Sequence, residues 1–426
     1  MQKKQLLMLL YINICLLCSC ANKSESETKT IETDIPKGEQ SIEEINFTKE
    51  EFLADYDYMW EVLEENYLFF GTIEDYGIDV EFLKQDTKQQ IEQHVTDLNS
   101  FVVMLNSLFQ QMQFFAHLGL LETDAYDVMY EYYCNTMVEE ESMRAWRISL
   151  ENPQTQIVYD YMKEKEFTDY VVKNESFPQA SYDAVRKTVM FQIPTFTHTC
   201  VERDKTFFID YLKSLDGMEI EHIIFDITGN RGGSDYYWEE NIVAPFGGNY
   251  EWIYYLYLKD TPLIRDYFFN GQTKVMPLSD LPEDHIPPSF INELGLTHFI
   301  RIQWQLSNNP VFKQEILSAK RWVLVDERVY SAADTFCAFC KATGWATLVG
   351  RRTLGDGIGY EPILETLPNT GLIIRFSGVV GESNEGFLNT AVGTAPDYYT
   401  DAKKLEDPVT ACKRLIDKEI NGDIDD

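Results

Sequence analysis

Short apolar segments with strand character alternate with helical segments between residues 183 and 412. Strand-like runs lie at 188–194, 222–227 and 322–325, and a later helical pattern ends at Gly344. Strands without a polar face need cover on both sides, which helices between successive strands provide. We therefore predict an α/β domain over residues 183–412.

The part of the chain before this domain is predicted to be helical. Thr48 and Glu51 have the spacing of a capping box, and apolar residues then recur at helical intervals. Two further helical patterns follow at 80–95 and 101–114, and residues 121–175 are predicted to be mostly helical. A peptide-binding PDZ domain would instead show five or six short strands, so we expect none here.

The chain has 426 residues, which is long for one compact core. Its apolar content of 44% and charged content of 25% are those of a globular protein, which excludes a wholly disordered chain and a polytopic membrane protein. The predicted organisation is a signal peptide at 1–19, a flexible tether at 20–45, a helical region at 46–120, a helical connecting segment at 121–182, the α/β domain at 183–412 and a polar tail at 413–426.

The N-terminus has the features of a bacterial lipoprotein signal. Lys3 and Lys4 precede an apolar stretch over 6–17, and a small residue then precedes Cys20. Cys18 fits less well as the lipid-bearing cysteine, because a leucine lies directly before it. We predict lipid attachment at Cys20 and an extracytoplasmic, membrane-anchored protein of the bacterial cell envelope; an ordinary signal peptide with incidental cysteines is the alternative.

The charge of the chain restricts its partners. Asp and Glu number 70 against 36 Lys and Arg, giving a formal net charge of −34. Such a chain repels phosphate backbones, so nucleic acid is excluded as an expected partner. A strongly acidic substrate is disfavoured for the same reason.

The cysteines do not indicate a metal site. Cys337 and Cys340 have C-x-x-C spacing, but they lie among apolar residues of a helical pattern, and no second pair completes a site. We interpret them as core residues. We predict no metal and no organic cofactor.

Three segments could carry chemistry. Asp226-Ile-Thr-Gly-Asn-Arg-Gly-Gly233 directly follows a strand, and its adjacent glycines let the backbone turn sharply and present N–H groups to an anion. Ser331 lies where a helix N-cap is expected, beside the small Ala332. His117 lies at the end of a predicted helix and could act as a base. Each also has a structural interpretation: a plain turn, a capping serine and a packed histidine.

Together, these segments resemble the tail-specific, or C-terminal-processing, serine peptidases, whose wider group includes the tricorn core protease and the interphotoreceptor retinoid-binding protein. The resemblance covers residues 47–400. Segment 226–233 is similar to the D-L-R-x-N-x-G-G turn of the family, and 330–334 to its x-S-A-A/S-E nucleophile segment. Ala116-His117 lies where many members carry D-G-H-T.

The sequence after the nucleophile segment also resembles the family. Residues 341–357 are similar to the family segment that ends in V-G-x-x-T-x-G-K-G, and 393–397 to its terminal G-x-x-P-D. The resemblance implies an α/β core related to the crotonase and ClpP type, preceded by a helical region. It also implies a peptide or protein substrate.

Two departures from the family pattern bear on the mechanism. Asp356 replaces the lysine of G-K-G, which excludes a Ser–Lys dyad at this position, and Thr228 replaces the usual arginine of the turn. The tricorn-like branch uses serine, histidine and an acid instead. The resemblance therefore implies Ser331 as nucleophile, His117 as base, and either Asp356 or Glu385 as the acid that orients the base.

The sequence thus predicts a lipid-anchored serine endopeptidase that forms an acyl-enzyme on Ser331. The backbone N–H groups of Gly232 and Ala332 are the expected oxyanion hole. Two alternatives stay open: a catalytically inactive peptide- or ligand-binding protein on the same fold, and an esterase or other acyl hydrolase that uses the same residues.

Overall fold

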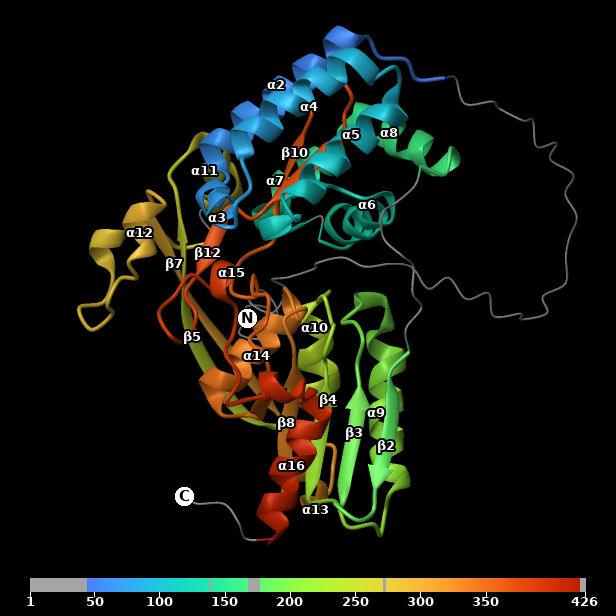
Figure 1. Ribbon diagram of the computed structural model, residues 1–426, viewed down its shortest axis with the longest axis vertical. Helices are drawn as coiled ribbons and strands as arrows, with labels where there is room; N and C mark the ends of the chain where they lie inside the picture. Colours follow the sequence, from blue (N-terminus) through green and yellow to red (C-terminus); the bar gives the residue numbers. More distant parts are fainter. Residues whose placement is uncertain (1–43, 138, 168–176, 271–272, 422–426) are drawn as a thin grey trace, which may run out of the picture.

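A computed structural model describes residues 44–137, 139–167, 177–270 and 273–421 (Figure 1). The predicted signal peptide, most of the predicted tether and Cys20 lie outside the described residues. None of the helices within the described ranges is both long enough and apolar enough to cross a membrane.

A six-stranded sheet forms the centre of the C-terminal part of the chain (Figure 1). All neighbouring strands are parallel except the β2–β3 pair, which is antiparallel. The strand order is β13 (Tyr398–Tyr399), β9 (Thr347–Gly350), β8 (Lys320–Val325), β4 (His222–Asp226), β3 (Thr188–Gln192) and β2 (Gln179–Asp183). The predicted α/β fold is confirmed.

Side chains alternate between the two faces of this sheet and are buried on both. Ile224 and Trp322 pack with residues of α16 (Pro408–Asn421) on one face. On the other face, Phe225 contacts Trp345 with ring centroids 5.6 Å apart, and Trp345 contacts Phe336 of α14 (Ala332–Thr343) at 5.7 Å. Because both faces are covered there, the central strands β4, β8 and β9 are largely apolar and buried, as the sequence pattern indicated, whereas the edge strands β2 and β13 are partly exposed.

The helical region before the sheet is also present. Thr48 and Glu51 form the predicted capping box, in which each side chain bonds the backbone N–H of the other residue. The helices here are α2 (Lys49–Asn66), α3 (Phe70–Asp75), α4 (Val80–His94), α5 (Leu98–Gln111), α6 (Thr123–Tyr130), α7 (Arg144–Leu150) and α8 (Pro153–Glu164). They lie at the opposite end of the molecule from the six-stranded sheet (Figure 1).

A small sheet joins the helical region to the C-terminal part of the chain. Its order is β1 (Gly119–Leu120), β11 (Ile373–Phe376) and β10 (Ile363–Thr366), and both pairings are antiparallel. Gly119 pairs with Arg375 in this register. The pairing places the segment just before β1, which contains His117, beside the residues that follow β11.

A long antiparallel ribbon flanks the central sheet. It consists of β5 (Gly248–Leu258) and β7 (His298–Asn308), extended by β6 (Val275–Pro277) and β12 (Val379–Gly381). The remaining helices are α9 (Val201–Ser214), α10 (Asp235–Trp238), α11 (Pro262–Phe268), α12 (Phe290–Glu293), α13 (Gln314–Leu317) and α15 (Asn389–Val392).

Candidate active site

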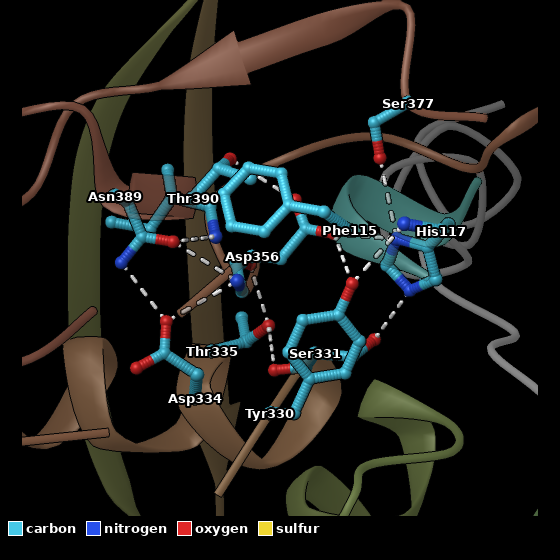
Figure 2. Close-up of polar contacts among 12 residues, drawn as sticks. Phe115, His117, Tyr330, Ser331, Asp334, Thr335, Asp356, Ser377, Asn389 and Thr390 are labelled. Carbon is cyan, nitrogen blue, oxygen red and sulfur yellow. Dashed lines mark hydrogen bonds and ion pairs between the residues drawn. The ribbon is translucent and has the colours of Figure 1, made fainter. Parts of the chain in front are cut away.

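Ser331 lies in the turn between β8 and α14, at the N-cap position of the helix. Its backbone has φ 54° and ψ −132°, and its side chain makes no capping hydrogen bond. The interpretation of Ser331 as a structural cap is therefore wrong. Ser331 is 2% exposed, and its hydroxyl points toward His117 (Figure 2).

His117 closes a short turn between α5 and β1. Ala116 and His117 both have positive φ, 52° and 59°. Two hydrogen bonds hold this turn in place. Tyr67 donates its hydroxyl to the Phe115 carbonyl at 2.7 Å, and the Ser377 N–H donates to the Ala116 carbonyl at 2.9 Å. The helical region and the segment after β11 thus together fix the backbone turn that carries His117.

Asp356 lies in the loop after β9, next to the nucleophile segment. Tyr330 and Gly355 form a parallel bridge, and the Ser331 N–H donates to the Gly355 carbonyl at 3.0 Å. Asp356 itself has φ 61°, and its side chain is 3% exposed. Its carboxylate is therefore held against the same turn that carries Ser331.

The three side chains form one continuous line of contacts (Figure 2). Ser331 Oγ lies 3.3 Å from His117 Nε2, and His117 Nδ1 lies 2.6 Å from Asp356 Oδ2. This is the arrangement of nucleophile, base and orienting acid that acyl-transfer enzymes use. Each of the three residues has a positive φ, a conformation that costs free energy outside glycine and that tends to occur at functional sites.

The comparisons with known proteins agree with this geometry. The model of peptidase family S41 matches residues 187–400, which is half of the chain. The chain belongs to peptidase family S41. Members of this family are serine peptidases, so the resemblance to the tail-specific peptidases is confirmed.

Several solved structures resemble this chain. A putative peptidase from Parabacteroides merdae is 17% identical with a TM-score of 0.47, and the match covers 87% of this chain and 97% of that one. Mature CPAF is 13% identical with a TM-score of 0.49, covering 87% and 96%. The photosystem II D1 C-terminal processing protease is 15% identical with a TM-score of 0.36, covering 58% and 54%. A comparison with curated protein sequences finds no match.

Of the two acids that the sequence left open, the structure places Asp356 against the imidazole. Glu385 instead forms an ion pair with Arg352, whose Nη1 lies 2.8 Å from its carboxylate. The Glu385 side chain is 42% exposed, whereas that of Asp356 is buried. Glu385 lies in the loop after β12, where its carboxylate pairs with Arg352 and not with His117, so its assignment to the candidate triad of this S41 peptidase is not supported.

The surroundings of Asp356 favour its ionised form. Burial by itself raises the pKa of the carboxyl. The facing imidazole of His117 outweighs this effect, together with hydrogen bonds from Tyr330 and Thr390, so the pKa of Asp356 lies below its ordinary value. Tyr330 donates to Oδ2 at 2.6 Å and Thr390 to Oδ1 at 3.0 Å.

Three supporting residues were not identified from the sequence. Besides holding Asp356, the Tyr330 hydroxyl accepts a hydrogen bond from the His117 backbone N–H at 3.2 Å. Ser377 Oγ lies 3.2 Å from His117 Nδ1, and Thr390 holds the acid. Tyr330 directly precedes the nucleophile, so its position in the motif was the available signal. Ser377 and Thr390 lie in segments without a recognisable motif.

A second buried carboxylate supports the turn that carries the nucleophile. Asp334, in the first turn of α14, accepts hydrogen bonds from the Thr353 hydroxyl at 2.5 Å and from Asn389 Nδ2 at 2.9 Å. Burial raises its pKa, although these hydrogen bonds act in the opposite direction. Asn389 also accepts from the N–H of Gly357 at 3.0 Å. The loop of Asp356 and the start of α14 are thereby locked together (Figure 2).

The glycine turn, residues 226–233, packs directly against Ser331. The Tyr330 N–H donates to the Asn230 carbonyl at 3.1 Å. A Cβ on Gly232 would lie 2.7 Å from the Tyr330 carbonyl oxygen and 2.9 Å from Ser331 Cβ, so the close approach requires glycine. Thr228, the departure from the family pattern, donates its hydroxyl to Asp226 at 2.7 Å and so closes the start of the turn.

The two predicted oxyanion donors differ in their surroundings. Ala332 begins α14, where backbone N–H groups lack partners within the helix. The Gly232 N–H lies nearby but donates to the Asn230 side-chain oxygen at 2.8 Å. The structure thus brings both residues beside Ser331, and their role as an oxyanion hole stays a prediction.

Proposed function

We propose that this S41 peptidase is a serine endopeptidase in which Ser331 is the nucleophile, His117 the general base and Asp356 the acid that orients the base. The observation that carries the proposal is the line of contacts from Ser331 Oγ through the imidazole to Asp356. The Nδ1–H group donates to Asp356, which leaves Nε2 as the proton acceptor facing the serine.

The first half of the reaction is acylation. Ser331 Oγ attacks the carbonyl carbon of the scissile peptide bond while its proton passes to His117 Nε2. The resulting imidazolium lies against the Asp356 carboxylate, whose low pKa keeps it negative and stabilises the positive ring. The C–N bond then breaks as Nε2 returns the proton to the leaving amine.

The second half removes the acyl group. A water molecule gives a proton to Nε2 and attacks the ester carbon, and His117 then protonates Ser331 Oγ as the carboxylic acid product leaves. No step needs a lysine, which accounts for the replacement of the family's G-K-G lysine by Asp356.

The negative oxygen that develops in both halves needs hydrogen-bond donors. We assign the Ala332 N–H as one donor, since the positive end of the α14 dipole adds to its effect. Gly232 serves as the second donor when its N–H turns from the Asn230 amide oxygen toward the oxyanion.

The alternative of an inactive binding protein predicts a gap between the serine and the histidine. The distance of 3.3 Å between Ser331 Oγ and His117 Nε2 is within reach of a proton transfer, so it favours the enzyme.

A fluorophosphonate probe tests this proposal without knowledge of the substrate. An activated Ser331 forms a phosphonyl ester with loss of fluoride, which intact mass spectrometry detects as a single adduct. We expect the adduct in the wild-type protein, none in Ser331→Ala and much slower labelling in His117→Ala. A peptide library digested in parallel distinguishes a peptidase from an esterase. An unlabelled wild-type protein that cleaves no peptide would favour the binding protein.

We also propose that the chain is lipid-anchored at Cys20 on the outer side of a bacterial membrane, which would place the peptidase in the cell envelope. This proposal is supported by the order and spacing of the apolar stretch, the small residue and the cysteine in the sequence. Expression of the full chain in bacteria with a fatty-acid label should give a labelled protein. Cys20→Ala should abolish the label and Cys18→Ala should keep it; the reverse result would move the anchor to Cys18.

A further inference from the structure

Arg231 occupies the position between Asn230 and Gly232 in the glycine turn. The next residue, Gly232, packs against Ser331, and the preceding one, Asn230, accepts a hydrogen bond from the Tyr330 N–H at 3.1 Å. The backbone of Arg231 is therefore held on both sides by contacts to the nucleophile segment, although its side chain is exposed.

The guanidinium of Arg231 lies over the ring of Tyr330, which borders the candidate triad. The guanidinium carbon is 5.0 Å from the centroid of the Tyr330 ring, and the His117 ring is 5.1 Å from the same centroid. Tyr330 in turn bonds Asp356 through its hydroxyl. Stacking on an aromatic face holds a guanidinium in place and leaves its N–H edge open to another group.

The charge of Arg231 is not neutralised within the described part of the chain, where it makes no ion pair. The arginines of the neighbouring loops differ: Arg328 pairs with Asp326 at 2.6 Å and Arg351 with Glu327 at 3.0 Å. The chain carries 70 acidic side chains against 36 basic ones, so carboxylates are abundant. Arg231 is exposed, lies close to the nucleophile segment and pairs with no described carboxylate, so its guanidinium is available to a ligand.

We propose that Arg231 selects substrates with a carboxylate near the scissile bond, an inference that rests on the proposed peptidase function. A guanidinium matches a carboxylate with two parallel hydrogen bonds. One residue of an extended peptide spans about 3.3 Å, so the two ring distances place that carboxylate within about three positions of the scissile bond.

The excess of negative charge on the protein limits this preference to a single carboxylate. At long range, the net charge of −34 repels a polyanionic peptide, whereas Arg231 attracts one carboxylate at contact distance. The preferred substrate is therefore a largely neutral peptide with one acidic group close to the bond that is cleaved.

Matched peptides test the inference. From a neutral peptide that the wild-type enzyme cleaves, each of the three residues on either side of the bond is replaced by Glu, by Gln or by Lys. At one position we expect kcat/KM to be roughly tenfold higher for Glu than for Gln. Arg231→Ala should bring this ratio close to one, and Arg231→Glu should favour Lys at the same position.

Arg144→Ala is the control for loss of positive charge as such. Arg144 is exposed and lies 3.7 Å from Glu141 in the helical region, so its loss should leave the Glu-to-Gln ratio unchanged. The inference is overturned if Arg231→Ala changes neither the Glu-to-Gln ratio nor the ratio of free-acid to amidated peptide, or if Arg144→Ala lowers either ratio equally. A wild-type enzyme that cleaves no peptide overturns the proposed function itself, and this inference with it.

The carboxylate can belong to an acidic side chain or to the C-terminus of the peptide. Amidated and free-acid forms of the same peptides separate these sources. A Glu-to-Gln preference that survives amidation identifies a side chain, and a higher kcat/KM for the free-acid than for the amidated form of the same peptide identifies a terminal carboxylate. Both results support Arg231 as the selecting residue, provided that Arg231→Ala removes the preference.

Discussion

The Tyr330 hydroxyl donates a hydrogen bond of 2.6 Å to Asp356 Oδ2, the same oxygen that faces His117. Tyr330 directly precedes the nucleophile in sequence, so the segment that carries Ser331 also fixes the acid at the other end of the triad. The hydroxyl in addition accepts from the His117 backbone N–H at 3.2 Å. One side chain thereby sets the spacing of all three residues.

Tyr330→Phe removes both of these hydrogen bonds without changing the ring. A hydrogen bond to a charged group contributes about 1.5–3 kcal/mol, so we expect kcat to fall roughly 10- to 100-fold with little change in KM. The measurement is steady-state kinetics on a cleaved peptide. Tyr182→Phe is the matched control, because its hydroxyl donates to the Glu219 carbonyl at 2.8 Å on the exposed β2 strand. A variant Tyr330→Phe with unchanged kcat would contradict the positioning role.

Asp356→Asn and Glu385→Gln decide between the two acids that the sequence allowed. An asparagine at 356 cannot stabilise the imidazolium and lets the ring adopt the wrong tautomer, so we expect kcat/KM to fall roughly 10²- to 10⁴-fold. Glu385→Gln loses an exposed ion pair with Arg352, which contributes about 0–1 kcal/mol, and activity should change by less than about fivefold. Kinetics and circular dichroism of both variants test this, and the opposite ranking would restore Glu385 as the acid.

Ser377→Ala should lower kcat/KM only slightly. Nδ1 carries a single proton, and Asp356 Oδ2 at 2.6 Å is a stronger and closer acceptor than Ser377 Oγ at 3.2 Å. A neutral hydrogen bond contributes about 0.5–1.5 kcal/mol, which corresponds to a loss of roughly 2- to 12-fold in kcat/KM. A loss as large as that of Asp356→Asn would show that Ser377 orients the ring.

The low pKa of Asp356 predicts the shape of the pH profile. Ionised Asp356 contributes stability above its unfolded pKa of about 3.9, and this contribution is lost as the pH falls through the lower native value. Above pH 5 the acid therefore stays ionised, and protonation of His117 alone should end activity on the acid side. We expect log(kcat/KM) to fall with a slope of one as the pH decreases. A slope of two between pH 5 and 7 would mean that Asp356 titrates as well.

The α/β core and the nucleophile could be predicted because their signals are local. The strands at 222–227 and 322–325 are apolar on both faces, and the segment 330–334 places a serine before a helix. The distances within the triad were not accessible in this way. His117 and Ser331 are 214 positions apart and meet because β1 pairs with β11.

The β5–β7 ribbon was not predicted, although the sequence carries a signal for it. Ile300, Ile302, Trp304 and Leu306 occupy alternate positions of β7 and are buried, which is the pattern of a strand with one covered face. Ser377 and Thr390 had no such signal, because their roles depend on hydrogen bonds to residues distant in the chain.

Gly232→Ala tests the close approach of the glycine turn to the nucleophile. With φ +94°, alanine is strained at this position, and its Cβ would lie 2.7 Å from the Tyr330 carbonyl oxygen and 2.9 Å from Ser331 Cβ. Gly217→Ala is the matched control, since Gly217 has φ +84° but nothing within 4 Å of an added Cβ. Backbone strain should cost each variant about 1–2 kcal/mol in the free energy of unfolding.

In Gly232→Ala, but not in Gly217→Ala, the clash should lower the free energy of unfolding by about a further 1–3 kcal/mol. Denaturant unfolding of both variants measures this difference. The displaced serine should also lower kcat/KM by roughly 100-fold, because a shift of about 1 Å at a reacting atom has effects of this size. Gly217→Ala should keep its activity at temperatures where both variants are folded. Equal activity and equal stability of the two variants would show that the turn does not press on Ser331.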